Sequence, residues 1–273
     1  MTKPKKKRKI GSNLYLAFVF LFLYLPIIVM MVFSFNESKS RANFTGFTFK
    51  WYTELFKNDL IMDSFWNTIL IAVLSSVIAT VLGTLAAIGI SNMKKFSRKA
   101  VMNATYLPII NPEIVTGVSL CLLFVFFAGF FGLQFGFATV LIAHITFVLP
   151  YVILNVLPKL RQMDKSIYEA ALDLGCNPWK AYWKVVLPEI MPGVFAGFLM
   201  SFTYSLDDFI ITYFVSGSGF QTLPVTIYGM VRKKVNPQIN ALSTILFVVV
   251  LLLLILMNLK GAKSAKKAKE KNV

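Results

Sequence analysis

Long apolar runs, each interrupted by few charges, most constrain what this chain can fold into. A run of about 20 such residues is long enough to cross the hydrocarbon core of a bilayer as a helix. Helices are favoured in lipid because they satisfy their own backbone hydrogen bonds. We therefore expect an all-α integral membrane protein. Its six expected transmembrane helices cover residues 14–35, 66–90, 101–127, 137–156, 192–214 and 242–259.

The polar residues argue against several other classes of protein. Only 15% of the residues are charged, whereas water-soluble domains carry about 25%. Cys121, Cys176 and the single histidine cannot form a disulfide framework or a typical metal cluster. The chain also contains no Gly-rich phosphate loop of the G-x-x-x-x-G-K-[ST] type. We therefore expect no metal site, no catalytic residues and no nucleotide bound through that loop.

Basic residues that flank the expected spans explain the formal net charge of +16. Lys and Arg are enriched in cytoplasmic loops, and 21 of the 28 lie on one side of the six-span arrangement. Both termini are therefore expected in the cytoplasm, with basic tails over residues 1–13 and 260–273 that contact membrane lipid. The opening KPKKKRK resembles a nuclear import signal, but basic flanks of membrane spans give no reason to expect nucleic-acid binding.

Two expected external segments are too apolar to be simple linkers. Residues 36–65 include Trp51 and Tyr52 among several charged side chains, which predicts a short folded element. Residues 215–241 contain the sequence GSGFQTLPVTIYGMVRKKVNP. Both segments suit a platform for an extracellular partner, and both equally suit a simple cover for the helix ends. Composition alone favours neither alternative.

A polar stretch between the fourth and fifth spans, SIYEAALDLGCNPWKAYWKVVLP at residues 166–188, is expected in the cytoplasm. Ser166 and Glu169 have the spacing of a capping box, in which each side chain satisfies a backbone N–H at the start of a helix. Gly175 suits the left-handed position that ends a helix. The first half of the stretch therefore predicts a short helix and a tight turn.

The second half of the stretch predicts another helix. Asn177 and Pro178 suit the N-cap and the first position of a helix. Leu187 and Pro188 are expected to end it. The whole stretch then forms a rigid element of two helices outside the membrane, suited to contact a partner.

This stretch resembles the EAA motif of ABC-importer permeases, the binding-protein-dependent transport inner-membrane components. In that family Glu-Ala-Ala is followed by three residues, a Gly, nine residues and Ile-x-Leu-Pro. Val185 replaces the Ile here, which is a conservative departure. The other matching residues are Glu169, Ala170, Ala171, Gly175, Leu187 and Pro188.

The resemblance implies a type I ABC-importer permease fold over residues 14–259. It implies that the segment 161–188 contains a coupling helix, which docks in a cleft of a separate cytoplasmic ATPase. Glu169 then caps its own helix, contacts the ATPase, or does both. Ala170 and Ala171 are small enough for close approach of the ATPase. ATP and Mg are used by that partner, and this chain binds no cofactor.

Further stretches resemble one membrane subunit of the spermidine/putrescine importer. They are FTFKWYTELF, INPEIVTGVSL, LIAHITFVLPYVILNVLPKL, SFTYSLDDFIITYFVSG and LPVTIYGMVRKKVNPQINALSTI. The resemblance implies transport roles for Ser205, Asp207, Asp208, Glu113 and Trp51. Where the family has Asp, this chain has Glu113, which keeps the negative charge. Trp51 is expected to contact the binding protein or form an external gate, unless it only anchors the chain at the membrane interface.

The acids at membrane depth give a partly independent argument for a cationic solute. The ionisable residues expected at that depth are Glu113, His144, Asp207 and Asp208, and none of them is Lys or Arg. Carboxylates and aromatic faces can both hold ammonium groups. On a regular helix one stripe contains Ser201, Tyr204, Ser205, Asp208 and Thr212. Asp208 is therefore expected nearer the pathway than Asp207, although an interhelical hydrogen bond is the alternative for each acid. His144 is expected to be a satisfied interhelical group.

The expected complex contains a second permease, either a homologue or an identical copy, and two ATPase subunits. An extracellular or periplasmic binding protein delivers the polyamine, and the complex lies in the cell membrane. The alternative within this class is an importer of ferric iron or another cation. Outside it, an ion-driven transporter could use Asp207 and Asp208 as a cation relay, but it would not need the EAA segment. A membrane scaffold is a further alternative.

Overall fold

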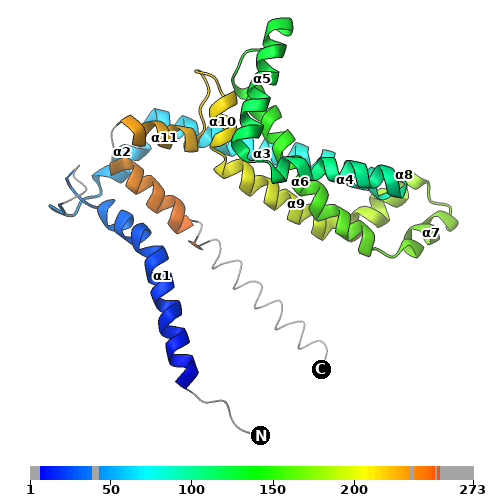
Figure 1. Ribbon diagram of the computed structural model, residues 1–273, viewed down its shortest axis with the longest axis horizontal. Helices are drawn as coiled ribbons and strands as arrows, with labels where there is room; N and C mark the ends of the chain where they lie inside the picture. Colours follow the sequence, from blue (N-terminus) through cyan, green and yellow to red (C-terminus); the bar gives the residue numbers. More distant parts are fainter. Residues whose placement is uncertain (1–6, 39–42, 234–236, 250, 253–273) are drawn as a thin grey trace. The chain divides into compact units, whose positions relative to one another are not determined.

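The computed structural model describes residues 7–38, 43–233, 237–249 and 251–252. The chain divides into two compact units, of which one is Asp63–Thr226 and the other combines Met1–Met62 with Ile227–Val273. We call them the central unit and the flanking unit. The described residues are almost entirely helical (Figure 1). Their only β-type pairing is an isolated bridge between Asn36 and Phe47.

Five helices of the described chain are long and apolar enough to cross a membrane. They are Gly11–Phe33, Asp59–Ser91, Glu113–Phe131, Phe137–Gln162 and Pro178–Asp207. The expected sixth span, residues 242–259, falls partly outside the described residues. Its residues 242–249 belong to a shorter apolar helix, Pro237–Val249. The all-α membrane architecture is confirmed, and the count of six spans stays a prediction.

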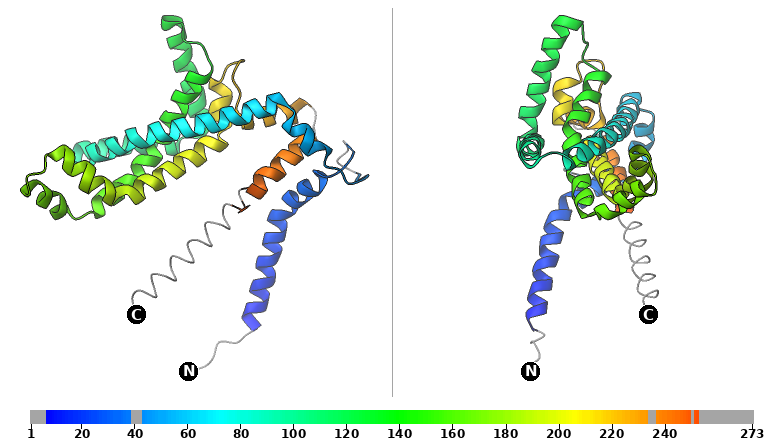
Figure 2. Two further views of the ribbon diagram at one scale, coloured as in Figure 1. Left: turned by 180° about the vertical axis from the view of Figure 1, so that it is seen from behind. Right: turned by 90° about the vertical axis from the view of Figure 1, so that its right-hand side faces the viewer.

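The central unit is built from long helices that lie side by side. Helix α6 provides much of its core and lies against α9 along most of its length (Figures 1 and 2). The short α10 packs between α5 and α6. The elements that form this unit are most of α3 (Asp59–Ser91), α4 (Lys95–Ile110), α5 (Glu113–Phe131), α6 (Phe137–Gln162), α7 (Lys165–Asp173), α8 (Pro178–Ala181), the π-helical turn η1 (Tyr182–Val186), α9 (Leu187–Asp207), α10 (Ile210–Val215) and the start of α11 (Leu223–Lys233).

The backbone breaks inside two of the expected spans, and one of these breaks was not predicted. The third was expected over residues 101–127 with its entry broken by Pro108 and Pro112; the break at Pro112 is confirmed, because α4 ends at Ile110 and α5 begins at Glu113, whereas Pro108 lies inside α4 and does not break it. Pro112 forces this break because its ring removes a backbone donor and restricts the residue before it. The fifth was expected over residues 192–214, but α9 ends at Asp207 and α10 begins at Ile210.

Glycines allow the close approach of the central helices. A Cβ atom added at Gly193 would lie 2.8 Å from the carbonyl oxygen of Asn155, and one at Gly197 would lie 3.1 Å from the Cα of Val152. A Cβ at Gly83 of α3 would lie 2.7 Å from the Cβ of the same valine. Small residues bring membrane helices into van der Waals contact, which drives their association where no water is displaced.

The flanking unit contains α1 (Lys7–Phe33), α2 (Lys50–Phe56) and the helix Pro237–Val249. Between α1 and α2 the backbone N–H of Glu37 donates to the carbonyl of Gly46, and that of Thr48 donates to the carbonyl of Phe35. Asn58, which follows α2, donates its side-chain amide to Gln238 at 3.1 Å. These contacts confirm the predicted short folded element for the described residues of the segment 36–65.

The close contact between α6 and α9 predicts different outcomes for two glycine-to-alanine changes. Gly193→Ala should reduce the free energy of unfolding by about 1–3 kcal/mol, because its methyl group overlaps the α6 backbone. Gly89→Ala is the control, since a Cβ there meets nothing within 4 Å. Thermal unfolding of the purified protein in detergent measures both. Equal melting temperatures for the two variants would contradict this packing.

Candidate functional site

The break in the fifth span is held by the carboxylate of Asp208. This residue follows the last residue of α9 and is buried. Its Oδ1 accepts from the backbone N–H of Ile211 at 3.2 Å, and its Oδ2 accepts from that of Thr212 at 2.9 Å. The hydroxyl of Thr212 also donates to Oδ2, at 2.8 Å. Asp208 therefore caps the start of α10, which is a structural role for this predicted pathway residue.

His144 of α6 connects both sides of the break. Its side chain is buried, with Nδ1 2.7 Å from the hydroxyl of Ser205 and Nε2 2.8 Å from that of Thr212. Nε2 also lies 3.3 Å from Oδ2 of Asp208. Ser205 in turn contacts Ser75 of α3 at 2.9 Å. The prediction that His144 is a satisfied interhelical group is confirmed.

The expected stripe assumed a continuous fifth helix, and this assumption is wrong, because α9 ends at Asp207 and α10 begins at Ile210. Ser205, Asp208 and Thr212 do come together, but they do so on His144, inside the unit. Asp207, at the last position of α9, is exposed instead. Of the two neighbouring acids, Asp207 is thus the one whose carboxylate is accessible in the described chain.

Glu113 interacts electrostatically both with Asp207 and with one member of a pair of stacked tyrosines. Glu113, in the first turn of α5, is exposed and is close enough to interact electrostatically with Asp207 and Asp208. Tyr204 of α9 stacks on Tyr151 of α6, with ring centroids 4.2 Å apart, and Tyr151 interacts electrostatically with Glu113. Carboxylates supply negative charge for a cation, and aromatic faces can add to its binding.

The start of the predicted cytoplasmic element differs from the capping box that its sequence suggests. Asp164 is the N-cap of α7, and its side chain accepts from the backbone N–H of Ser166 at 2.9 Å. This hydrogen bond stabilises the charged form and holds the pKa of the Asp164 carboxyl below its usual range. Ser166 thus lies inside the helix, and the predicted cap at Ser166 and Glu169 is wrong. Glu169 is exposed on α7.

The turn that follows α7 confirms the prediction for Gly175. Its φ of +81° is left-handed, a conformation that favours glycine. The N–H of Gly175 donates to Leu172, and that of Cys176 donates to Ala171, which is the paired pattern of a Schellman C-cap. The carbonyl of the second EAA alanine therefore closes the turn. Ala170 is exposed, whereas Ala171 is buried.

The second half of the element begins as predicted and ends differently. The side chain of Asn177 accepts from the N–H of Trp179 at 3.1 Å, and Pro178 is the first residue of α8. Leu187 and Pro188 do not end this helix. It continues through η1 into α9, because proline is tolerated in the first turn of a helical segment and the wider turn before it accommodates the ring.

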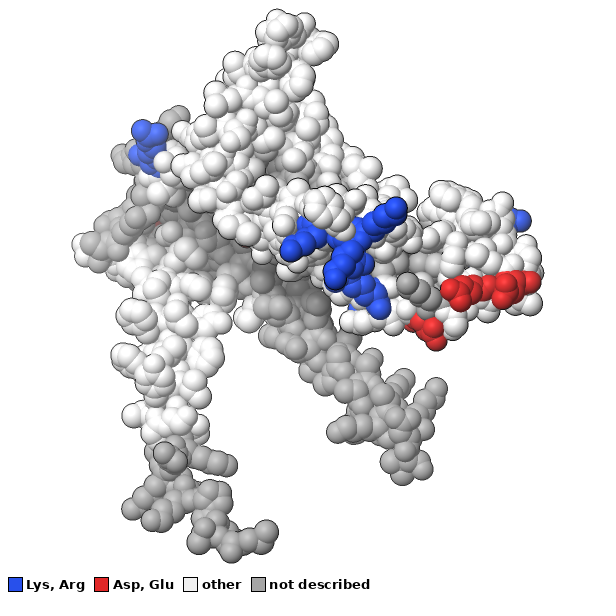
Figure 3. Space-filling model, turned by 45° about the vertical axis from the view of Figure 1, so that its right-hand side comes forward, with Lys and Arg blue, Asp and Glu red and all other residues white. Residues whose placement is uncertain are grey.

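Charged side chains mark one end of the central unit. Figure 3 shows basic side chains gathered near acidic ones, while most of the visible face between them and the far end carries no charge. The basic residues of α4 are Lys95, Arg98 and Lys99, and the acidic residues of α7 are Glu169 and Asp173. Such clustering of charge is typical of the polar side of a membrane.

Trp51 lies inside the flanking unit. Only 2% of its surface is exposed, and its indole N–H donates to the carbonyl of Asn36 at 2.6 Å. The indole thus connects α2 to the end of α1. Its predicted contact with a binding protein stays a prediction, but the exposed aromatic residues of the same segment are Phe44, Phe47, Phe49 and Phe56.

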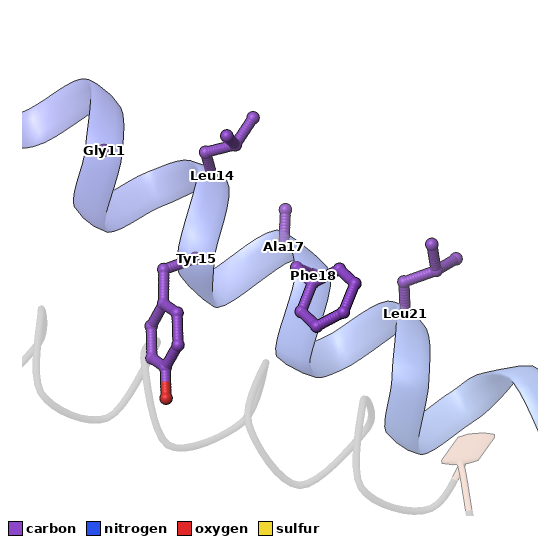
Figure 4. Close-up of a pocket in the computed structure, with 6 residues that line it drawn as sticks. All are labelled: Gly11, Leu14, Tyr15, Ala17, Phe18 and Leu21. Atoms are coloured by element: carbon purple, nitrogen blue, oxygen red, sulfur yellow. The ribbon is translucent and has the colours of Figure 1, made fainter.

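The hollow on α1 is not a candidate site, and the described residues offer no candidate metal site. An apolar hollow runs along one face of α1 and is distant in sequence from every predicted site residue (Figure 4). It is lined by Gly11, Leu14, Tyr15, Ala17, Phe18 and Leu21. Among the described residues, no group of three or more His, Cys, Asp or Glu side chains is placed to hold a metal ion.

Sequence reasoning missed three residues of these sites. Tyr151 stacks on Tyr204, Asp164 caps α7, and Asn36 accepts the Trp51 indole. Only Asp164 had a local signal, since an Asp directly before a helix is a common N-cap. The other two depend on contacts between residues far apart in the chain.

Comparison with known proteins assigns the family. Residues 79–262 match the family described as "Binding-protein-dependent transport system inner membrane component". This range contains α9, the broken span and the whole EAA segment. The chain belongs to this family. It is therefore an inner-membrane component of a transport system, and the alternatives of an ion-driven transporter or a scaffold are set aside.

Curated relatives and solved structures agree with this family. The chain is 38% identical to the spermidine/putrescine transport system permease protein PotC of Escherichia coli K12, over 78% of this chain and 80% of that protein. It is 39% identical to the putrescine transport system permease protein PotI of the same strain, over 78% and 77%. A bacterial ABC transporter that imports alginate shares the fold, with a TM-score of 0.68 and 17% identity over 92% of this chain and 94% of that one.

The buried Trp51 predicts a structural effect that its matched control lacks. Trp51→Phe removes the donor to the Asn36 carbonyl and should destabilise the flanking unit by about 1–3 kcal/mol. Limited proteolysis should then cleave residues 43–58 faster. Trp66→Phe is the control, because Trp66 is 65% exposed. If the two variants are cleaved at the same rate, the indole does not hold this segment.

Proposed function

We propose that this chain is one of two membrane subunits that form the translocation pathway of an ATP-driven polyamine importer. The observation that carries this proposal is the identity of 38% with a spermidine/putrescine permease over 78% of the chain. The exposed carboxylates of Glu113 and Asp207 beside the Tyr151–Tyr204 pair suit an extended cation that carries several ammonium groups.

The proposed complex has a second permease, two cytoplasmic ATPase subunits that use ATP and Mg, and a periplasmic or extracellular binding protein. The chain itself binds no cofactor and catalyses no reaction. Both termini lie in the cytoplasm, which the distribution of Lys and Arg supports. In this orientation α7 and its exposed Glu169 face the ATPase, and Asp207 lies deep in the fifth span.

Movement of the ATPase reaches the pathway through one continuous helix. ATP binding closes the ATPase pair and displaces the segment that contains Glu169 and Gly175. The chain from Pro178 to Asp207 is helical throughout, so displacement at its cytoplasmic end also moves the carboxylate at its other end. Alternating access then exposes Asp207 to the binding protein in one state and to the cytoplasm in the other.

Transport by the complete complex tests this function. The chain is reconstituted in proteoliposomes with the neighbouring-gene permease, ATPase and binding protein, and ATP-dependent uptake of labelled spermidine and putrescine is measured. Uptake should depend on ATP and be inhibited by excess unlabelled polyamine, but not by ferric iron or amino acids. Uptake of one of those solutes in place of polyamines would assign the complex to another substrate.

A charge reversal at Glu169 tests the coupling role. Glu169→Lys places a positive charge where the proposed contact needs an acid, so polyamine uptake should fall at least about tenfold, a loss of about 1.4 kcal/mol or more in coupling. The basal ATPase rate of the complex should lose its stimulation by the loaded binding protein. Glu270→Lys makes the same change of charge in the C-terminal tail and should leave uptake intact. Normal uptake by Glu169→Lys would overturn this role.

A further inference from the structure

The hydrogen bonds around His144 have a direction that follows from counting protons. Thr212 has a single hydroxyl proton, which it donates to Oδ2 of Asp208 at 2.8 Å. Its oxygen must therefore accept at its 2.8 Å contact with His144, so Nε2 of the imidazole is the donor. The same nitrogen lies 3.3 Å from Oδ2 of Asp208. His144 thus directs an N–H at the capping carboxylate and its threonine.

The other ring nitrogen anchors His144 to two further helices. Nδ1 lies 2.7 Å from Ser205 of α9, and Ser205 lies 2.9 Å from Ser75 of α3. All of these side chains are buried. A buried polar group that loses its hydrogen-bond partner cannot bond to water instead, and leaving it unpaired costs free energy. Each member of such a network therefore holds the others in place.

The capping carboxylate replaces two bonds that a regular helix would make. In a continuous fifth helix, the N–H groups of Ile211 and Thr212 would donate to the carbonyls of Asp207 and Asp208, four residues back. Here the Asp208 side chain accepts from both N–H groups. Without this cap, continuing the helix is the simplest way to satisfy them. In a continued helix the carbonyl of Asp207 would accept a hydrogen bond. The negative C-terminal end of α9, which lies beside the exposed carboxylate of Asp207, would then be lost.

Contacts at the other end of α10 fix the short helix against α6. Thr139 of α6 donates its hydroxyl to the carbonyl of Val215 at 2.7 Å, and it also contacts the carbonyl of Gly136. On the opposite side, a Cβ at Gly117 of α5 would lie 3.4 Å from the Cα of Ile211. Since α10 is held at its far end, the position of the break depends on the contacts of His144 and Asp208.

We propose that His144 is a positioning residue for transport. It holds the break between α9 and α10 through Thr212 and Asp208, and in this way it keeps Asp207 at the open end of α9, facing the cation. His144 and Asp208 do not touch the substrate. The proposal rests on the proposed function only in treating the fifth span as part of the pathway.

The accessibility of position 207 tests this proposal without any substrate. Asp207→Cys is introduced after Cys121→Ala and Cys176→Ala, and its rate of labelling by a water-soluble cationic thiol reagent is measured in the whole complex. Adding His144→Leu should slow labelling about tenfold or more, as expected for loss of a hydrogen bond to a charged group. Thr203→Cys, one turn earlier on α9 and also exposed, should label at the same rate with either residue at position 144.

Two further variants keep the test decisive if His144→Leu does not fold. In His144→Gln the side-chain amide reaches the place of Nε2 and can still donate to Thr212, so labelling of position 207 should be preserved. In His144→Asn the amide reaches only the place of Nδ1, so labelling should fall as with Leu. Equal labelling in the Gln and Asn variants would overturn the proposal.

Transport kinetics give a second readout. His144→Leu should raise the KM for spermidine about tenfold with little change in kcat, because the cation site is displaced while the coupling segment is intact. Combined with Asp207→Asn, it should add no further loss, since both changes act on one carboxylate. Multiplying losses would overturn the positioning role. Absence of spermidine uptake by the unsubstituted complex would count against the proposed function, and the labelling result would still decide the role of His144.

Discussion

The arrangement of the central unit depends on how the backbone N–H and C=O groups at a break in a helix find hydrogen-bond partners inside a membrane. Lipid offers no hydrogen bonds, so backbone groups released by a break need partners from the protein or from a water-filled path. Asp208 supplies these partners for the start of α10, and His144 supports Asp208 from α6. A regular helix would need neither residue. Their presence allows α9 to end at membrane depth with an acid at its last position.

Close packing and polar pairing have separate tasks in this unit. Glycines of α3 and α9 let those helices lie directly on α6, which fixes their distance. The chain of polar contacts from Ser75 through Ser205 and His144 to Thr212 fixes their register, because a shift along the axis would separate several buried donors from their acceptors. The tyrosine pair on α6 and α9 then has a defined position relative to Glu113 and Asp207.

Much of this structure could be predicted from local signals. Apolar length gave five of the spans, and Gly175, Asn177 and Pro178 marked the turn in the EAA segment correctly. Local signals failed where the role of a side chain depends on contacts with residues far away in the sequence. Asp208 looks like a pathway acid on a helical stripe until the partners of its carboxylate are known. Ser166 fits a cap by spacing, but Asp164 lies closer to the helix start and takes that role.

The π-helical turn at Tyr182–Val186 has a mechanical consequence. It joins α8 to α9 without a loop, giving 30 helical residues from Pro178 to Asp207, or about 45 Å at 1.5 Å per residue. Because no loop interrupts it, a displacement at the Pro178 end is passed along the helix toward Asp207, with the π-helical turn and Pro192 as the points where the helix can bend. The wider turn contains an extra residue, and moving that extra residue along the helix would rotate the residues between its old and new positions by about 100°. The turn is therefore a place where the side chains of a short stretch of α9 can change the face of the helix on which they lie, without any unwinding of the rest.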